Sequence, residues 1–191
     1  MQRTHLIGLT GSRRSGKDTV ASRIQEYISN HPEGNLVVRV AFADKIKESS
    51  LAIDPWIVTT EGPRRLADLV DLYGWEHCKD DYPGVREFLQ RFGTDAVRKI
   101  IGAETWIDLT KADIEDCLAN GWTVVVTDVR FQNEIHLIRE LGGEIWEIQR
   151  DTGLPVDRHV SEQEWRTISP DRVITNDGTL QDLYQQVIYN L

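Results

Sequence analysis

The sequence predicts a three-layer α/β fold in which helices flank a parallel sheet of about five strands. Short apolar runs alternate along the chain with longer segments of helical periodicity, which is the pattern of repeated strand and helix units. The run Val124-Val125-Val126 is apolar on both faces, as expected of an interior strand in a parallel sheet. At 191 residues the chain has the usual length of one domain. We therefore expect a single domain over residues 1–191.

The individual elements follow from apolar periodicity and from the glycines and prolines that interrupt it. Leu36 to Phe42 is expected to form an edge strand, because charged Arg39 suits an edge better than the interior of a sheet. Val85 to Ile101 has helical spacing around Gly93, which predicts two helical pieces with a break there. The other expected strands are Leu6 to Leu9, Trp122 to Thr127, Glu144 to Gln149 and Arg172 to Thr175. One further helix is expected to carry the apolar stripe Val20, Ile24, Tyr27 and Ile28, and a short helix is expected to begin at Asp44. The remaining expected helices span Trp106 to Leu118, Glu134 to Leu141 and Leu180 to Ile188.

Two stretches lack a clear period. Asp54 to Pro83 is punctuated by prolines and glycines and is expected to be mostly helix and loop. Arg150 to Pro170 has little apolar periodicity beyond Trp165, which makes it the best candidate for a lid over a binding site.

Charge and cysteine usage exclude several classes of function. The chain carries a formal net charge of −9, and because residues 1–50 contain 8 basic and 5 acidic residues, the acidic excess lies in the remainder. This balance disfavours a broad nucleic-acid-binding face and is compatible with a small anionic ligand. Cys78 and Cys117 are isolated, which argues against a disulfide scaffold or a zinc cluster and suits a reducing cytoplasm. No apolar run approaches the ~20 residues that span a bilayer, and we expect a soluble, unprocessed protein.

The segment from Gly11 to Thr19 is the strongest functional signal. Its pattern G-x-x-x-x-G-K follows an apolar strand and opens a helix, so backbone N–H groups and the helix N-terminus can bind a polyphosphate. Lys17 adds a cation for the outer phosphates. Asp18 stands where Ser or Thr is usual, and Thr19 comes one position late. The alternative is a glycine turn that only joins strand to helix. The context favours a nucleotide site, whose cofactor-binding residues are Gly11, Arg14, Ser15, Gly16, Lys17, Asp18 and Thr19.

Phosphoryl transfer needs positioned phosphates and neutralised charge, and the chain offers residues for both. Asp128 follows a predicted interior strand and could hold Mg²⁺ with Asp18 or Thr19, because Mg²⁺ prefers hard oxygen ligands. The alternative for Asp128 is an N-cap of a helix over residues 129–141. Trp106 could line a base pocket, although a core position is the more usual use of tryptophan. Guanidinium groups for phosphate binding could come from Arg98, Arg130, Arg150 and Arg158. The alternative for each is a solvated surface arginine, from which Arg130 is the exception because it lies two residues after Asp128.

His159, Ser161 and Glu162 contain the residue types of a hydrolase triad. The chain has no nucleophile elbow such as G-x-S-x-G, so we interpret them as polar contacts of the lid.

Several blocks together resemble the bacteriophage deoxynucleoside monophosphate kinases, which belong to the P-loop kinase group with adenylate and thymidylate kinases. These blocks run through most of the chain in the expected order and are more specific than the phosphate loop alone. The G-K-D-T form of that loop is similar to the family's own. The blocks are Gly11 to Ala21 (GSRRSGKDTVA), Phe42 to Lys47 (FADKIK), Leu89 to Thr94 (LQRFGT) with Arg98 and Trp106, Asp128 to Glu134 (DVRFQNE) and His159 to Glu162 (HVSE).

The resemblance implies a P-loop kinase fold and transfer of the ATP γ-phosphate to a deoxynucleoside monophosphate, with ATP as phosphoryl donor and Mg²⁺ as cofactor. It also implies that residues 54–105 form a helical region that binds the monophosphate nucleotide and that residues 150–170 form a lid. Arg98 and Arg130 would bind the acceptor phosphate, and Arg150 and Arg158 the transferring phosphoryl group. The implied catalytic residues are Lys17, Arg130, Arg150 and Arg158, the substrate-binding ones Asp44, Lys47, Gln90, Arg98, Trp106, Asp128 and Arg130, and the adenine-side ones Asn176, Gly178 and Thr179.

Two alternatives stay open on the sequence. Another small-molecule kinase of the same fold, such as a phosphomevalonate or dephospho-coenzyme A kinase, can also carry a G-K-D loop. A nucleotide-dependent switch that performs no transfer is a different class, but it would need no second phosphate site. The partners expected are ATP and a deoxynucleoside monophosphate, with no nucleic acid and no membrane, in the cytoplasm (of the host cell if a phage encodes the chain). The sequence leaves monomer or homodimer open.

Overall fold

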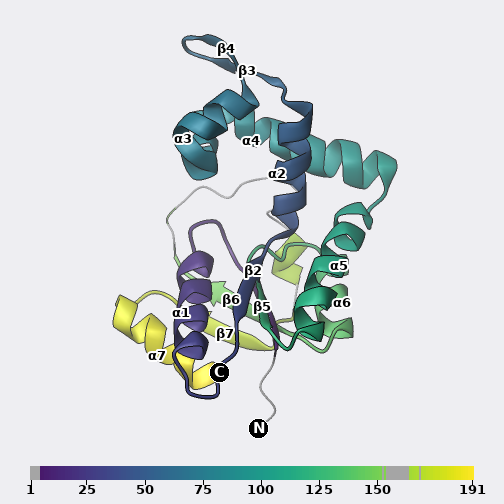
Figure 1. Ribbon diagram of the computed structural model, residues 1–191. Helices are drawn as coiled ribbons and strands as arrows, with labels where there is room; N and C mark the ends of the chain where they lie inside the picture. The colour runs from purple at the N-terminus through teal and green to yellow at the C-terminus, as the bar shows by residue number, and fades with distance from the viewer. Residues whose placement is uncertain (1–4, 152, 154–163, 168) are drawn as a thin grey trace. The chain divides into compact units, whose positions relative to one another are not determined.

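The computed structural model describes residues 5–151, 153, 164–167 and 169–191 (Figure 1). The chain divides into two compact units. One consists of Met1–Phe42 and Ile107–Leu191, and the other of Ala43–Trp106. The expected monophosphate-binding region, residues 54–105, falls inside the second unit.

The first unit is built on a five-stranded parallel sheet in the order β2-β5-β1-β6-β7, as predicted. The strand with the charged Arg39 lies at an edge, where it was expected. The apolar strand β5 lies between β2 and β1, which explains why it is buried on both faces. The strands are β1 (Leu6–Thr10), β2 (Val37–Val40), β5 (Thr123–Val126), β6 (Glu144–Gln149) and β7 (Arg172–Thr175).

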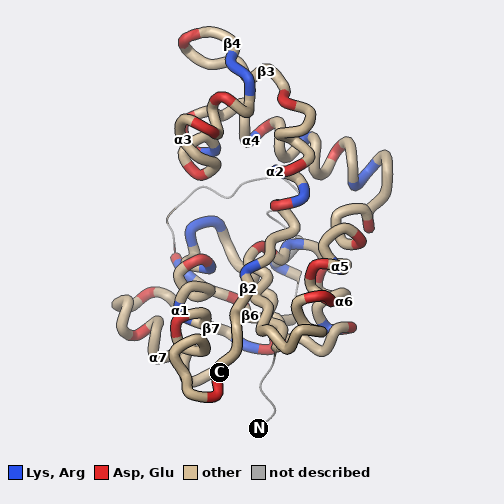
Figure 2. The backbone as a smooth tube through the Cα atoms, viewed as in Figure 1, with Lys and Arg blue, Asp and Glu red and all other residues tan. Residues whose placement is uncertain are grey.

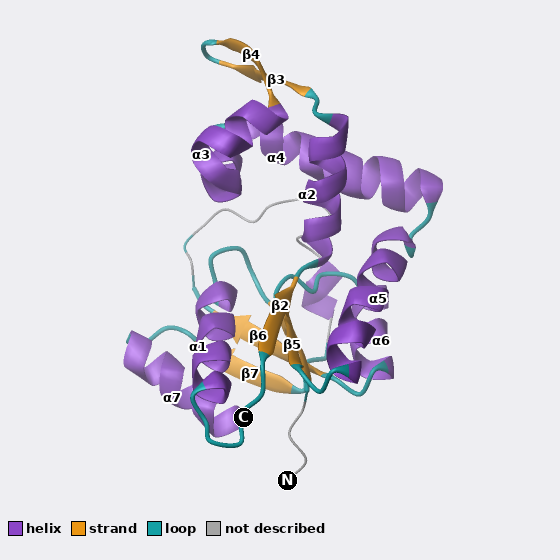
Figure 3. Ribbon diagram, viewed as in Figure 1, coloured by secondary structure: helices purple, strands orange, loops and turns teal. Residues whose placement is uncertain are grey.

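Helices cover both faces of this sheet and give the predicted three layers (Figure 3). One face packs against α1 (Lys17–Ser29) and α7 (Leu180–Asn190), where Ile24 of α1 and Leu183 of α7 join Leu9 of β1 in one core. The other face packs against α5 (Thr105–Ala119) and α6 (Gln132–Glu140). The alternation of strand side chains between the two faces thus produces two separate cores.

The second unit contains α2 (Phe42–Ile53), α3 (Leu66–Asp81) and α4 (Pro83–Gln90), followed by the π-helix η1 (Arg91–Ile101). It also contains a hairpin of β3 (Trp56–Thr59) and β4 (Gly62–Arg65), which the expectation of mostly helix and loop missed. In β4 the apolar alternation of a strand is absent, because Gly62-Pro63-Arg64-Arg65 is largely exposed. Only Ile57 of the hairpin is buried in the core of this unit.

The predicted break at Gly93 is wrong. α4 passes directly into η1 at Arg91, and the change is from α-helical to π-helical hydrogen bonding, with Gly102 N still donating to Val97 O at 2.9 Å. Gly93 serves close packing instead, since a Cβ atom there would lie 2.8 Å from Cδ1 of Ile46. A glycine in a helical pattern can thus signal contact with a neighbouring helix as well as an end.

Both cysteines are free thiols, as predicted. Cys78 is buried and its thiol donates to Leu69 O at 3.2 Å, whereas Cys117 is partly exposed. Burial raises the pKa of both thiols, and nearby Asp81 and Asp116 add to the rise in pKa of Cys78 and Cys117 respectively. Among the described residues, no helix is both long and apolar enough to cross a membrane.

Candidate functional site

The loop between β1 and α1 is held by its carbonyl oxygens. Nζ of Lys17 donates to Gly11 O at 2.9 Å and to Ser12 O at 2.8 Å. Gly11 (φ 132°) and Gly16 (φ 104°) adopt backbone conformations that favour glycine. Arg14 also has a positive φ, of 60°. Donors that bind the carbonyl oxygens suit a loop whose backbone N–H groups bind an anion.

A second donor comes from the far end of the chain. Nδ2 of Asn176, which follows β7, donates to Ser15 O at 2.8 Å, and the backbone N–H of Asn176 donates to Gln149 O at 2.7 Å. The fit is close, because a Cβ atom at Gly16 would lie 2.4 Å from this Nδ2. Gly16 therefore allows the side chain of Asn176 to reach the loop. The sequence placed Asn176 beside adenine, and the structure gives its amide group a bond to the phosphate loop.

Ser15 is fully buried under this loop, and its Oγ has no hydrogen-bond partner in the described structure. Thr10, the last residue of β1, is equally buried and its Oγ1 is also unpartnered among the described residues. Buried hydroxyl groups without partners are costly, so two of them at one loop indicate that bonds form there when a ligand or water is present.

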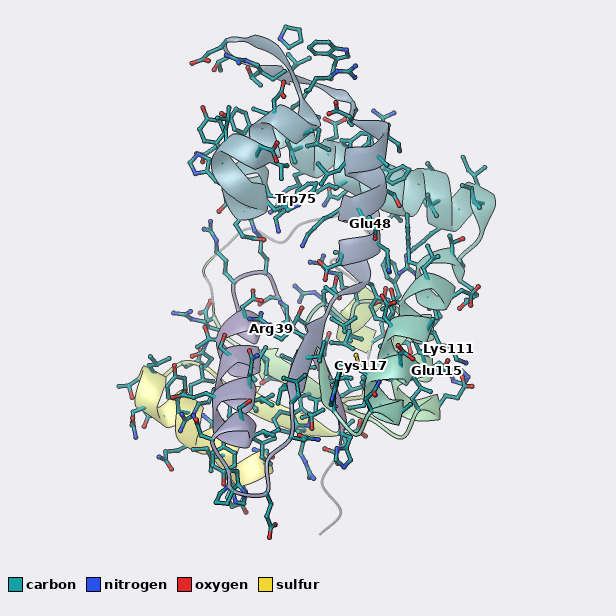
Figure 4. All side chains as sticks on the ribbon, in the orientation of Figure 1. Arg39, Glu48, Trp75, Lys111, Glu115 and Cys117 are labelled. Carbon is teal, nitrogen blue, oxygen red and sulfur yellow. The ribbon has the colours of Figure 1, made fainter. Side chains whose placement is uncertain are left out.

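Asp18 contacts the edge strand of the sheet. Its Oδ1 accepts a hydrogen bond from Nη2 of Arg39 on β2 at 2.6 Å, and Nη1 of Arg39 lies 3.4 Å from Oγ of Ser22 (Figure 4 labels Arg39). The Asp18 side chain is 86% exposed, so the ion pair contributes at most about 1 kcal/mol to stability. Sequence patterns did not indicate Arg39 as a partner of Asp18, because these two residues are 21 positions apart in the chain.

Donors for a divalent cation are present but sparse. In the part of the chain that the structure describes, no group of three His, Cys, Asp or Glu side chains is arranged to hold a metal ion. Asp18, Thr19 and Asp128 are hard oxygen donors, which fit Mg²⁺ if phosphates and water complete its shell. Basic residues on the loop before α1 add positive charge (Figure 2).

The segment after β5 is held in the opposite way, by its N–H groups. Val129 N donates to Leu9 O at 3.0 Å. Arg130 N and Phe131 N both donate to Oε2 of Glu134, at 2.7 and 3.1 Å. Arg130 is thus fixed at the carboxyl end of an interior strand, beside the strand that leads into the phosphate loop.

Asp128 does not cap the helix that follows it, so that interpretation is wrong. The helix α6 begins only at Gln132, and Oδ1 of Asp128 accepts instead from Phe42 N, the first residue of α2, at 2.9 Å. The carboxylate that caps α6 belongs to Glu134, which was not among the predicted site residues. Its signal was available, because Glu is favoured at the third position of a helix.

Gly178 and Thr179, expected near adenine, directly precede α7, and Thr179 is its N-cap residue. Thr179 N donates to Oδ2 of Asp182 at 2.9 Å, and Asp182 N donates back to Oγ1 of Thr179 at 3.2 Å. Hydrogen bonds from the Thr179 side chain and backbone hold the pKa of Asp182 below its ordinary value. Gly178 lies close enough to Asp182 that a Cβ atom would meet its Oδ2 at 2.8 Å. A helix cap therefore accounts for both residues.

The loops that follow β6 and β7 are tied together, because Asp151 N donates to Oδ1 of Asp177 at 3.1 Å. Arg150, at the end of β6, is exposed beside this bond. The end of the predicted lid is also attached to the first unit, since Nε2 of Gln132 donates to Oγ1 of Thr167 at 2.9 Å. Arg158 and the trio His159, Ser161 and Glu162 lie outside the described residues.

The remaining predicted substrate residues belong to the second unit. On α2, Nζ of Lys47 donates to Oδ1 of Asp44 at 3.0 Å. Gln90 ends α4, and Arg98 on η1 has its Nη1 3.4 Å from Ala103 O. Trp106 is only 2% exposed and its Nε1 donates to Gly93 O at 2.9 Å. Trp106 is therefore a core residue.

Comparisons with known proteins agree on one family. The family model described as deoxynucleotide monophosphate kinase matches residues 74–187. A protein of Acanthamoeba polyphaga mimivirus assigned to the deoxynucleotide monophosphate kinases is 32% identical over 203 aligned residues, covering 96% of this chain and 94% of that protein. The deoxynucleotide monophosphate kinase of Enterobacteria phage T4 is 28% identical over 109 residues, covering 56% of this chain and 45% of the phage protein.

Among solved structures, an APS kinase of Mycobacterium tuberculosis aligns over 98% of this chain and 96% of its own, with a TM-score of 0.43 and 18% identity. The family assignment does not depend on this likeness. It depends on the family model, which spans more than half of the chain, and on the mimivirus relative, whose alignment covers nearly the full length of both proteins. This chain belongs to the deoxynucleotide monophosphate kinase family.

Proposed function

We propose that this protein transfers the γ-phosphate of ATP to the 5′-phosphate of a deoxynucleoside monophosphate, giving ADP and the deoxynucleoside diphosphate. Membership of the family supports this proposal. The structural observation that carries it is the loop from Gly11 to Thr19, whose carbonyl oxygens are bound by Lys17 and Asn176 in a way that suits a polyphosphate on the N–H side.

The donor end of the reaction is assigned to the loop. Nζ of Lys17 lies against the carbonyl oxygens of Gly11 and Ser12, which keeps this ammonium group at the loop that would hold the β- and γ-phosphates. The buried hydroxyl of Ser15 supplies a further donor under the loop. These groups neutralise charge that grows on the leaving phosphate, which is the main protein contribution to phosphoryl transfer.

The acceptor phosphate is assigned to Arg130, and the family resemblance also implies Arg98 for it. A guanidinium group can bind a phosphate through two parallel hydrogen bonds and stays charged at any working pH. Asp44, Lys47 and Gln90 are proposed to contact the rest of the nucleotide. A general base is not required, because the second pKa of a phosphate monoester is about 6 and its oxygen is already a nucleophile at neutral pH.

Asp18, Thr19 and Asp128 are the residues that would hold Mg²⁺, directly or through water. When bound, Mg²⁺ would supply charge neutralisation between the outer phosphates. In the described structure Asp18 is bonded to Arg39 and Asp128 to Phe42 N, so Mg²⁺ would have to share these carboxylates with those partners. Arg150 and Arg158 are proposed to reach the transferring group from the lid.

A coupled assay of ADP release with Mg²⁺ over the deoxynucleoside monophosphates tests the proposal. Phosphomevalonate and dephospho-coenzyme A serve as the competing acceptors, and a reaction without acceptor measures ATP hydrolysis. We expect turnover with at least one deoxynucleoside monophosphate and none with the competing acceptors. Turnover with no deoxynucleoside monophosphate would contradict the proposal.

The division into two phosphate sites is tested by Arg130→Ala. We expect turnover to fall by about 10²-fold or more while ATP binding, measured by calorimetry, stays within about twofold. Arg172→Ala is the matched control, because Arg172 lies on β7 of the same sheet and makes a partly exposed ion pair with Glu144, at 3.5 Å. If ATP binding collapses in Arg130→Ala, the two sites are assigned wrongly.

A further inference from the structure

Glu134 is the one acidic or basic side chain that is buried among the described residues, with 2% of its surface exposed. Burying a carboxylate is costly unless strong hydrogen bonds compensate. A helix cap alone does not require burial, since Asp182 caps α7 with the same spacing from an exposed position. The burial of Glu134 therefore needs a further explanation.

The bonds of Glu134 go beyond the cap. Besides Phe131 N, which precedes α6, its Oε2 accepts Arg130 N at the shorter distance of 2.7 Å. With Val129 N donating to Leu9 O, consecutive N–H groups from Val129 to Phe131 are all bound within the protein. An anion at this strand end therefore finds no backbone donor from these three residues, and of their side chains only that of Arg130 offers a positive charge.

We propose that Glu134 is the positioning residue for Arg130. Its buried carboxylate fixes the backbone of Arg130 between the end of β5 and the start of α6, so that the guanidinium group extends from a rigid base toward the acceptor phosphate. This inference rests on the proposed function, because it takes the acceptor phosphate as the ligand of Arg130. Rigid placement of the backbone matters because a segment that must be ordered at each binding event lowers the affinity for the ligand.

A double-mutant cycle on nucleotide binding tests this role. The dissociation constant of the best deoxynucleoside monophosphate is measured by calorimetry for the wild type, Glu134→Gln, Arg130→Ala and the double variant. Glu134→Gln keeps an acceptor oxygen and removes the charge. We expect it to weaken binding about tenfold in the wild type and less than twofold in the Arg130→Ala background, while ATP affinity changes less than twofold.

Asp182→Asn is the matched control, since it removes the charge of the other capping carboxylate and should leave monophosphate affinity unchanged. An equal penalty for Glu134→Gln in both backgrounds would overturn the inference, because the residue would then act on the fold and not through Arg130. A wild type that binds no deoxynucleoside monophosphate would overturn the proposed function together with the inference, so the two failures are distinct.

A measurement on the wild type alone covers the case in which Glu134→Gln does not fold. In hydrogen exchange, the amides of Arg130 and Phe131 should be protected to a degree similar to that of Val125 in β5, because their acceptor is buried. Exchange of these two amides at the rate of an open loop would overturn the inference.

Discussion

The phosphate loop and the segment after β5 are stabilised through opposite backbone groups: the loop through its carbonyl oxygens and the segment through its N–H groups. In the loop, side-chain donors from Lys17 and Asn176 bind backbone carbonyl oxygens. In the segment from Asp128 to Phe131, the carboxylate of Glu134 and the carbonyl of Leu9 bind backbone N–H groups. The two segments follow the neighbouring strands β1 and β5, so one edge of the sheet carries both arrangements.

This difference decides how each segment can bind phosphate. A loop supported through its carbonyl groups can offer backbone N–H groups, which depend little on side-chain identity. A segment whose N–H groups are already bound offers only its side chain, so Arg130 and its support cannot be exchanged freely. Loss of side-chain donors should therefore impair the phosphate loop, whereas loss of the Glu134 carboxylate or of the Arg130 guanidinium group should impair the segment after β5.

The largest effect is expected from Lys17→Met, which removes the support of the loop and its cation together. Turnover should fall by about 10³-fold, because the positive charge that would stabilise the transferring phosphates is lost. Lys111→Met is the control, since Lys111 on α5 makes ion pairs with Glu115 at 3.9 Å and Glu140 at 3.5 Å (Figure 4). A steady-state assay of both variants checks this. A fall of less than about tenfold in Lys17→Met would show that the loop amides act without the lysine.

The second largest effect is expected at Asp128, where two roles can be separated. Asp128→Asn keeps the oxygen that accepts Phe42 N but removes the charge proposed for Mg²⁺. Turnover should fall by about 10- to 100-fold at low Mg²⁺, with the free energy of unfolding nearly unchanged. Asp128→Ala should in addition lower that free energy by about 1 kcal/mol, because Phe42 N loses its partner. Chemical denaturation and Mg²⁺ titration measure the two quantities. Equal activity of Asp128→Asn and wild type would assign Asp128 to structure alone.

The sequence predicted the sheet and the loop because their signals are local. Short continuous apolar runs identify β1 and β5, and the glycine spacing identifies the loop without any distant partner. The supports were not predicted, since Asn176 and Ser15 are 161 positions apart, and Arg39 meets Asp18 only after β2 joins the sheet. Glu134 could have been found from its position in α6, but its burial depends on tertiary packing.

The second unit was harder to predict for a related physical reason. Its hairpin is exposed, so β4 lacks the apolar alternation that identifies a strand. Gly93 allows contact with Ile46, a residue of another helix, and helical periodicity alone cannot distinguish that use from a break.

A smaller effect is expected from Asn176→Asp, which reverses the polarity of one loop support. The variant replaces the donor that faces Ser15 O with a carboxylate oxygen, so both a bond and the fit against Gly16 are lost. The KM for ATP should rise about tenfold with the KM for the monophosphate little changed. The control is Asn190→Asp, since Nδ2 of Asn190 donates to Gln186 O at the same 2.8 Å within α7. An equal rise in both KM values would contradict the separation of the two segments.

The smallest effect is expected from Asp182→Asn, which tests whether an exposed capping carboxylate behaves differently from buried Glu134. Bonds from Thr179 lower the pKa of Asp182 in the folded protein, so its contribution to stability is present above the pKa of the unfolded state. That contribution is lost as the pH falls through the lower, folded pKa. The wild type should therefore be slightly more stable than the variant at neutral pH, and the two should converge in acid. Urea denaturation at several pH values measures the difference, and a stability gap that persists at the lowest pH would show that the cap does not depend on charge.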